Sequence, residues 1–277
     1  MTRLALIQMV SGERLEENLR QLLPLLTEAS ISGASMAVLP ENFALFDSAA
    51  LRPFAEREKA EAYVQGWLAE QAKRLRIWIV AGSLPQSVRP DGSELEAPLI
   101  RSASLVFDAR GERVARYDKI HLFDVDVADG QGSYRESAYV EAGEQLVVID
   151  TPCGRLGLTV CYDLRFPDQY QRLREMGAEL ISVPSAFTYV TGEAHWEVLL
   201  RARAVENQCY LLGVNQGGWH SERRQTWGHT LCVDPWGTVC GQIESGAGVL
   251  MVDISLERLA EIRQQMPVLA HKQQAEY

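Results

Sequence analysis

The chain has 277 residues, 47% hydrophobic and 23% charged, a balance that excludes disordered and fibrous proteins. The formal charge is −10, and no basic cluster exceeds the pair Arg223 and Arg224, which disfavours a nucleic-acid partner. No stretch approaches the roughly 18 to 20 apolar residues of a membrane span, and the first apolar run is interrupted at Gln8. We therefore expect a cytoplasmic, soluble protein whose residues 1–277 form a single domain.

Apolar runs and amphipathic segments alternate along the chain. Runs rich in Val, Ile and Leu predict strands at 3–9, 34–40, 77–83, 102–108, 115–121, 145–150, 154–162, 178–186, 209–216, 229–240 and 247–254. Apolar residues three to four positions apart predict helices at 13–29, 56–75, 167–177, 193–208 and 255–266. Pro167 in the first turn and Gly177 after the last turn mark the ends of the third helix. These elements predict an α/β fold with helices outside mixed sheets.

Reactive residues follow three of these predicted strands. They are Glu41 in LPENF, Lys119 in YDKIHLF and Cys161 in VCYDLRFP. Taken singly, they have ordinary explanations as a loop cap, a surface lysine and a packed thiol. Because open α/β sheets bind ligands at strand ends, the three together indicate a site.

Cys161 stands out among five scattered cysteines. Their odd number and the lack of C-x-x-C spacing predict reduced thiols, of which one is reactive. A free thiol is only a few per cent ionised at neutral pH, so its attack on a carbonyl needs a base or a positive field. Glu41 and Lys119 would supply these. A histidine base is the competing hypothesis, but no histidine lies in a known protease signature.

These motifs resemble the nitrilase superfamily of carbon–nitrogen hydrolases, which uses a Glu-Lys-Cys triad. The similarity extends through YRESAYVEAGE, the long segment VPSAFTYVTGEAHWEVLLRARAVENQCYLLGVNQ and GHTLCVDPWGTV. It is strongest to the Nit branch, which includes the deaminated glutathione amidases. The resemblance implies a four-layer αββα sandwich that dimerises into αββααββα through the helices after Cys161 and around residues 194 to 207.

The resemblance also implies catalytic roles. Cys161 attacks the amide carbon, and the oxyanion lies against the Lys119 ammonium and the backbone N–H of Tyr162. Glu41 transfers the protons, and water hydrolyses the resulting thioester. Glu136, in SYRESAY, takes the position of an additional catalytic glutamate that orients Lys119. Its alternative is a surface carboxylate beside Arg135.

Two further residues are implied in substrate binding. Arg165, four residues after the nucleophile, would bind a substrate carboxylate, because a guanidinium holds a carboxylate with two hydrogen bonds. The alternative is a structural ion pair with Asp163. Phe187, in PSAF, would line the same pocket.

The expected function is hydrolysis of a small carboxylate-bearing amide to acid and ammonia. Deaminated glutathione is the expected substrate, and α-ketoglutaramate, the substrate of ω-amidase, is the alternative. A hypothesis of another class is a catalytically idle protein that uses the fold for interactions. The sequence has no nucleotide-binding motif and no metal-ligand spacing, so water is the only co-reactant expected.

Overall fold

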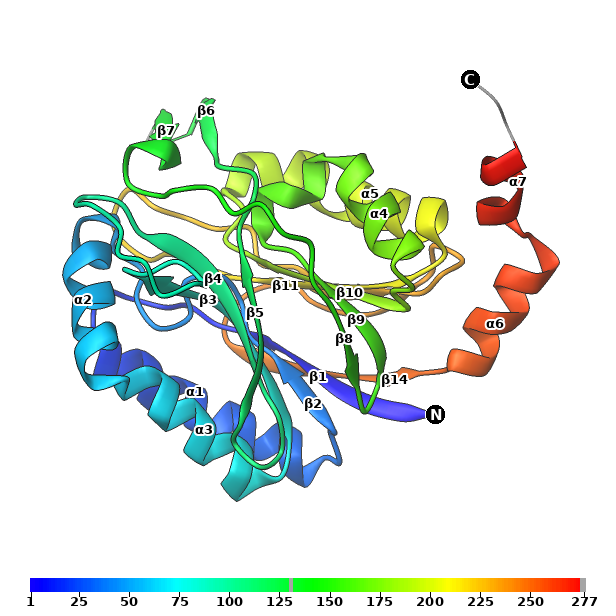
Figure 1. The fold of residues 1–277 in the computed structure, drawn as a ribbon, viewed down its shortest axis with the longest axis horizontal. Coiled ribbons are helices and arrows are strands. Elements are labelled where there is room, and N and C mark those ends of the chain that lie inside the picture. The colour runs from blue at the N-terminus through cyan, green and yellow to red at the C-terminus, as the bar shows by residue number, and fades with distance from the viewer. Residues whose placement is uncertain (130–131, 275–277) are drawn as a thin grey trace.

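The computed structural model describes residues 1–129 and 132–274, with two stacked six-stranded sheets between outer helices (Figure 1). The first sheet has the order β14-β1-β2-β3-β4-β5, and the second has the order β13-β12-β11-β10-β9-β8. Each sheet has three central parallel strands flanked by antiparallel ones. The predicted α/β class and the four-layer order are confirmed.

The strands of the first sheet are β1 (Thr2–Gln8), β2 (Met36–Val38), β3 (Trp78–Gln86), β4 (Arg101–Phe107), β5 (Arg113–Asp118) and β14 (Gly248–Ile254). Those of the second are β8 (Val148–Thr151), β9 (Gly154–Leu158), β10 (Leu180–Ser185), β11 (Tyr210–Asn215), β12 (Thr230–Val233) and β13 (Val239–Ile243). A small hairpin pairs β6 (Asp124–Asp126) with β7 (Ser133–Arg135).

The helices form the two outer layers. The first sheet is covered by α1 (Leu15–Ile31), α2 (Leu51–Glu61) and α3 (Tyr63–Leu75), and the second by α4 (Pro167–Glu175) and α5 (Tyr189–Asn207). Helices α6 (Leu256–Gln265) and α7 (Val268–Gln274) extend away from the body at the C-terminal end (Figure 1). No helix in the described ranges combines the length and the apolar character needed to cross a membrane.

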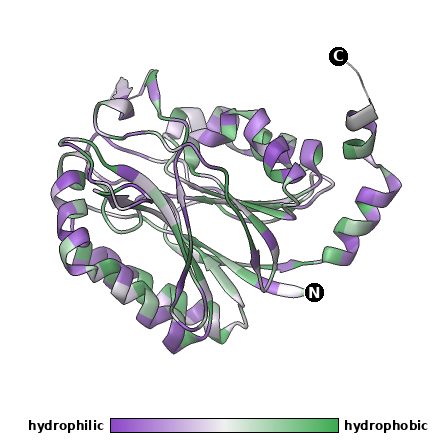
Figure 2. Cartoon of the chain, in the orientation of Figure 1, coloured by the Kyte–Doolittle hydropathy of each residue, from purple (hydrophilic) through white to green (hydrophobic). Residues whose placement is uncertain are grey.

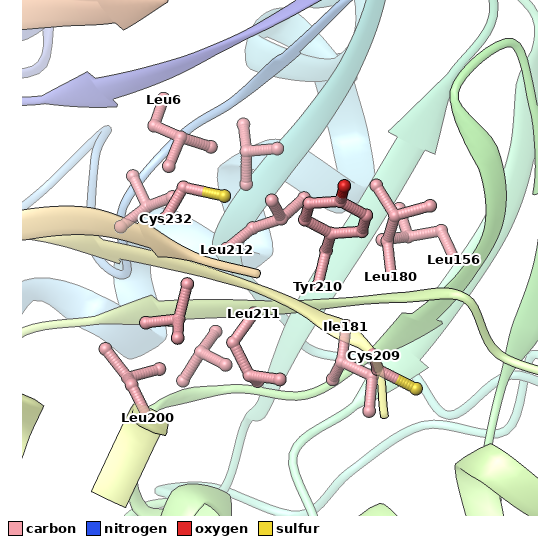
Figure 3. Packing of buried hydrophobic residues seen from close by; sticks show 14 of the residues in the cluster. Leu6, Leu156, Leu180, Ile181, Leu200, Cys209, Tyr210, Leu211, Leu212 and Cys232 are labelled. Carbon is pink, nitrogen blue, oxygen red and sulfur yellow. The ribbon is translucent and has the colours of Figure 1, made fainter. Parts of the chain in front are cut away.

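The buried core follows the alternation of side chains along the strands. On β11, Leu212 points towards Leu6 of the first sheet and Tyr210 lies on the same side beside Leu180, whereas Leu211 points towards Leu200 of α5 (Figure 3). Both faces of the strand are therefore apolar, and its sequence is a continuous hydrophobic run. Hydrophilic residues are concentrated on the outer helices (Figure 2). Burying each such leucine contributes about 1.5–3 kcal/mol, so the core fixes the spacing of the two sheets.

Most predicted elements are present, but the helix expected at 56–75 is divided. Ala62 adopts a left-handed φ of 49° between α2 and α3. The buried Glu58 carboxylate accepts hydrogen bonds from the backbone N–H groups of Val64 (2.9 Å) and Gln65 (2.8 Å). It thereby satisfies the first donors of α3, which favours a new helix over continuation of the old one.

Candidate active site

Glu41 lies in a sharp turn three residues after β2. Its neighbour Asn42 has a left-handed φ of 57° and donates its backbone N–H to Ser83 Oγ at 3.0 Å. The turn approaches β3 so closely that a Cβ on Gly82 would lie 2.1 Å from the Pro40 carbonyl oxygen. The Gln216 amide, next to β11, donates to the Glu41 carbonyl oxygen at 3.0 Å. Both sheets therefore hold this turn in place.

Lys119 directly follows β5 and is almost fully buried. Its Nζ donates to Glu41 Oε1 at 3.0 Å and to both carboxylate oxygens of Glu136 at 2.9 Å. Two carboxylates, 78 and 17 residues from the lysine in sequence, thus meet at its ammonium group.

Glu136 is also held from the other side. The backbone N–H of Phe123 donates to its Oε2 at 2.6 Å, which orients the carboxylate towards Lys119. Arg135, whose proximity suggested a surface pair, instead binds Asp126 at 2.9 Å. The structure therefore places Glu136 inside the site rather than in a surface pair with Arg135.

Cys161 lies three residues after β9, at the start of a short 3-10 helix (Cys161–Arg165). Its φ is 50°, a left-handed conformation that costs a non-glycine residue on the order of 1–3 kcal/mol. The buried Asp163 carboxylate accepts the backbone N–H of Val160 at 2.8 Å and that of His121 at 3.0 Å. It also accepts the Tyr117 hydroxyl at 2.6 Å. Asp163 thus fixes the turn that carries Cys161.

The charged groups of the site shift one another's pKa values. Burial is the main reason that the pKa of the Cys161 thiol lies well above its ordinary value, and the Glu41 carboxylate adds to the shift, whereas Lys119 opposes it. Burial disfavours charge on Lys119, but Glu136 and Glu41 hold the pKa of Lys119 well above its usual range. Burial also raises the pKa of Glu136, against the opposing effect of Lys119. The Cys161 thiol is therefore protonated at neutral pH, and any reaction as a nucleophile would require it to lose this proton.

These side chains line one cavity of about 530 Å³, a volume that includes the open solvent at its mouth. The cavity is lined by Glu41, Asn42, Lys119, Phe123, Tyr134, Glu136, Tyr139, Cys161, Tyr162, Ala186, Phe187, Thr188, Thr191 and Arg224. The sequence-based candidates Glu41, Lys119, Glu136, Cys161, Tyr162 and Phe187 are all among them.

Arg165 lies beside this cavity rather than in its lining. Its guanidinium carbon is 5.8 Å from the ring centroid of Tyr162 and 5.6 Å from that of Phe187, and both rings line the cavity. Both terminal nitrogens lie 3.3 Å from His195 Nδ1. The alternative partner Asp163 bonds to His121 and Tyr117.

The histidines lie outside the catalytic cavity, since its described lining contains none. His121 Nδ1 is 2.8 Å from Asp163, and its ring stacks on Phe166. His220 is bound between the Ser11 carbonyl oxygen and Thr226 Oγ1, each at 2.7 Å, and burial lowers its pKa to about 4. This arrangement gives no support to a histidine base.

Several lining residues were not predicted as site residues. Tyr134 and Tyr139 flank Glu136 in SYRESAY, and Arg224 belongs to the basic pair noted from composition. The sequence contains these signals, but only the folded chain brings the segment around Arg224 next to that around Glu136.

Known proteins are similar to this chain in sequence and in fold. The family model described as carbon-nitrogen hydrolase matches residues 3–264. A deaminated glutathione amidase from Yersinia enterocolitica is 50% identical over 268 residues, which are 96% of this chain and 91% of that protein.

Solved structures agree with this match. The Caenorhabditis elegans NitFhit protein superposes with a TM-score of 0.88 at 36% identity, over 98% of this chain and 64% of that longer one. A mutant amidase from Nesterenkonia sp. AN1, with acrylamide added at its active site cysteine, gives a TM-score of 0.78 at 27% identity, over 99% of this chain and 100% of that chain.

Proposed function

The chain belongs to the carbon–nitrogen hydrolase family, and from this premise we propose that it is an amidase that forms a thioester on Cys161. The observation that carries the proposal is the meeting of a thiol, a carboxylate and an ammonium in one cavity. Lys119 Nζ is 3.0 Å from Glu41, and both side chains influence the pKa of Cys161. A nucleophile, a proton acceptor and a positive charge are what acyl transfer from an amide requires.

The first half of the reaction forms the thioester. Glu41 accepts the Cys161 proton while sulfur bonds to the amide carbon, and the carbonyl oxygen becomes an oxyanion. The Lys119 ammonium and the Tyr162 backbone N–H stabilise that oxyanion. Glu41 then gives the proton to the amide nitrogen, the C–N bond breaks, and the amine leaves.

The second half regenerates the thiol. Glu41 takes a proton from water, the hydroxide oxygen bonds to the thioester carbon, and the C–S bond breaks. The proton returns to sulfur, and the carboxylic acid leaves. Glu136 is a positioning residue in this scheme, because its carboxylate holds Lys119 through two hydrogen bonds.

Deaminated glutathione is the proposed substrate, supported by the 50% identity to an amidase named for it. Cleavage of its α-ketoglutaramyl amide releases cysteinylglycine as the amine, and ammonia is the product only for the alternative substrate α-ketoglutaramate. Arg165 remains the proposed partner of the keto-acid carboxylate, because it lies over the rings of Tyr162 and Phe187 that line the cavity.

Trapping the intermediate tests this function. We expect mass spectrometry of the acid-quenched enzyme to find an α-ketoglutaryl adduct on Cys161, with cysteinylglycine released in equal amount at the first turnover. Turnover without a Cys161 adduct would contradict the covalent route, and absence of turnover on both candidate substrates would contradict the amidase assignment.

We also propose a homodimer formed through α5. Val198 is 60% exposed and Val205 51% exposed on this helix, and Trp236 is 54% exposed on the adjoining β12–β13 turn. Gly237 in that turn lies against Val205, which places the turn that carries Trp236 beside α5. Light scattering at micromolar concentration should give twice the chain mass of 30.9 kDa, and the single-chain mass would refute the dimer.

A single domain over residues 1–277 and a cytoplasmic location are further proposals. All five cysteines lie in the described part of the chain and are free thiols, which supports a reducing compartment.

A further inference from the structure

Two of the five cysteines lie next to each other at one edge of the second sheet. Cys232 is on β12, and Cys240 is on the edge strand β13, which pairs with β12. The Cys232 side chain is fully buried and lies near Leu6 of the first sheet (Figure 3), whereas Cys240 is exposed. Neither thiol is among the described residues that line the catalytic cavity, so the proposed amidase reaction leaves the pair without a role.

A β-bulge brings the two thiols to the same face of the sheet. Cys232 pairs with Gly241, and Val233 pairs with Val239, which leaves Cys240 as an extra residue between the two pairs. In a regular strand Cys240 would point to the face opposite that of Gly241, because side chains alternate along a strand. The bulge interrupts this alternation, and the Cys232 thiol donates a hydrogen bond to the Cys240 sulfur.

This geometry suits a covalent bond between the two sulfur atoms. Residues that oppose each other on antiparallel strands have Cα atoms about 4.5–5.5 Å apart, within the roughly 4.4–6.8 Å that disulfides span. Cys240 Sγ also donates to the Thr238 carbonyl oxygen at 3.7 Å, a weak bond that a rotation towards Cys232 would replace. In the described part of the chain, β13 has a hydrogen-bonded strand on one side only, so it can adjust to the bridge.

The two sulfur atoms differ in reactivity. Their shared hydrogen bond lowers the pKa of Cys240 and raises that of Cys232, which burial raises further. Burial and the Asp234 carboxylate oppose the shift at Cys240 without reversing it. Burial raises the pKa of each of the other three thiols. Cys240 is therefore the most readily ionised of the five thiols, and the thiolate is the form that reacts with peroxides.

We propose that Cys232 and Cys240 form a redox modification site, which hydrogen peroxide converts into an intramolecular disulfide. The Cys240 thiolate attacks one peroxide oxygen, the O–O bond breaks, and Cys240 becomes a sulfenic acid while the second oxygen leaves as hydroxide and takes up the proton that Cys240 released. The Cys232 sulfur then bonds to the Cys240 sulfur, the S–O bond breaks, and the Cys232 proton leaves with the oxygen as water. Two thiols and one peroxide thus give one disulfide and two water molecules.

Peptide mass mapping reads this bridge directly. No Lys or Arg lies between positions 225 and 257, so the tryptic peptide 225–258 contains Cys232, Cys240 and no other cysteine. The reduced native enzyme is treated with one equivalent of hydrogen peroxide and then alkylated in denaturant. We expect most of this peptide to carry no alkyl group and to weigh two hydrogen atoms less than its dithiol form. Dithiothreitol added before the alkylation should restore two alkylated thiols.

Two variants show whether the bridge needs this pair. Cys240→Ala removes the exposed thiol, so Cys232 should stay a buried, unmodified thiol after the same treatment. Cys153→Ala is the matched control, because it removes another fully buried thiol and leaves the pair intact, and it should form the bridge as the wild type does. Dimedone present during oxidation of the wild type should be found on Cys240 rather than on Cys232, since the exposed thiolate reacts first.

Three results in the wild type would each overturn the proposal. Peptide 225–258 could keep both alkyl groups, gain oxygen instead of losing hydrogen, or be linked through Cys240 to a second chain. None of these results bears on the amidase, because Cys161 lies in a separate tryptic peptide, 156–165, whose mass reports its own oxidation state. Failure of the redox pair is therefore distinguished from damage to the proposed catalytic thiol.

Discussion

The two sheets contribute unlike parts of the candidate site. The first sheet and the segment after it supply charge: Glu41, Lys119 and Glu136, joined by hydrogen bonds of 2.9 to 3.0 Å. The second sheet supplies the protonated thiol of Cys161 on a left-handed backbone. In the proposed reaction, the first half provides the electrostatic environment, and the second half fixes the position of the sulfur atom that bonds to the substrate.

The charged half and the thiol half of the site therefore affect the stability of the fold in different ways. Burying three charges is costly, and replacing buried ion pairs by apolar groups often leaves stability unchanged or improves it. The charged half is therefore expected to serve catalysis more than folding. The thiol half contains strain that Asp163 and its hydrogen bonds compensate.

The largest expected effect comes from the thiol half. Cys161→Ala removes the proposed nucleophile, so kcat should fall by about 10⁴-fold or more in a coupled assay of α-ketoglutarate release. Cys240→Ala is the matched control, because it removes an exposed thiol outside the site and should keep full activity. Hydrolysis at a normal rate by Cys161→Ala would assign the chemistry to the charged half alone.

Glu41→Gln tests whether the charged half transfers protons during the reaction. Removing the proton carrier should lower kcat for the amide by roughly 10²- to 10⁴-fold. A thioester substrate, whose leaving group departs without a proton, should lose less in acylation when single-turnover rates are compared. Equal losses for the two substrates would show that Glu41 does not protonate the departing amine.

Glu136→Gln should have a smaller effect, roughly 10- to 100-fold on kcat, the range for losing a charged partner in a buried site. Because the Glu136 carboxylate raises the pKa of Lys119, its removal should move the alkaline limb of the pH–rate profile to lower pH. Arg135→Gln is the control, because it removes the exposed pair with Asp126 and two hydrogen bonds to backbone carbonyl oxygens but leaves the Glu136 carboxylate in place. An unmoved alkaline limb would argue for a purely structural role.

The smallest effect on activity is expected where the two halves are joined, at the hydrogen bond between Tyr117 and Asp163. Tyr117→Phe removes a donor to Asp163 and the acceptor of the Gln169 amide and the Ile120 backbone N–H, so it should reduce the free energy of unfolding by about 1–3 kcal/mol in urea titration, with a several-fold loss of kcat. Tyr210→Phe removes a hydroxyl that contacts Ser255 away from the site, and it should affect stability alone. Equal activity in the two variants would contradict a role for Asp163 in positioning Cys161.

The apolar strands and the outer helices could be predicted from the sequence for a physical reason, whereas the four-layer order was implied by the family resemblance. Strands such as Leu180–Ser185 are continuous apolar runs because they are buried on both faces, and reactive residues follow strand ends as compact motifs. The four predicted catalytic side chains do line one cavity. The short hairpin of Asp124–Asp126 and Ser133–Arg135 escaped prediction, because three-residue polar strands have no hydrophobic period.

The features that the sequence did not predict depend on residues that are distant in sequence but meet in the folded chain. Arg224 lies 88 positions from Glu136, and no local pattern links the two residues, although both line the catalytic cavity. The division of the helix at Ala62 depended on the side chain of Glu58 reaching forward to cap the next helix. Such contacts depend on where side chains meet in space, and hydrophobic periodicity carries no information about them.

The Asp163 carboxylate has a consequence for how this chain can change over evolutionary time. It is bonded at once to Tyr117 and His121, at the end of the first sheet, and to Val160, at the end of the second. The spacing of the two reactive halves therefore depends on a few short polar bonds as well as on the packing of the interior. Apolar residues between the sheets can drift among similar volumes, whereas a change at position 163 should separate the nucleophile from its charged partners in a single step.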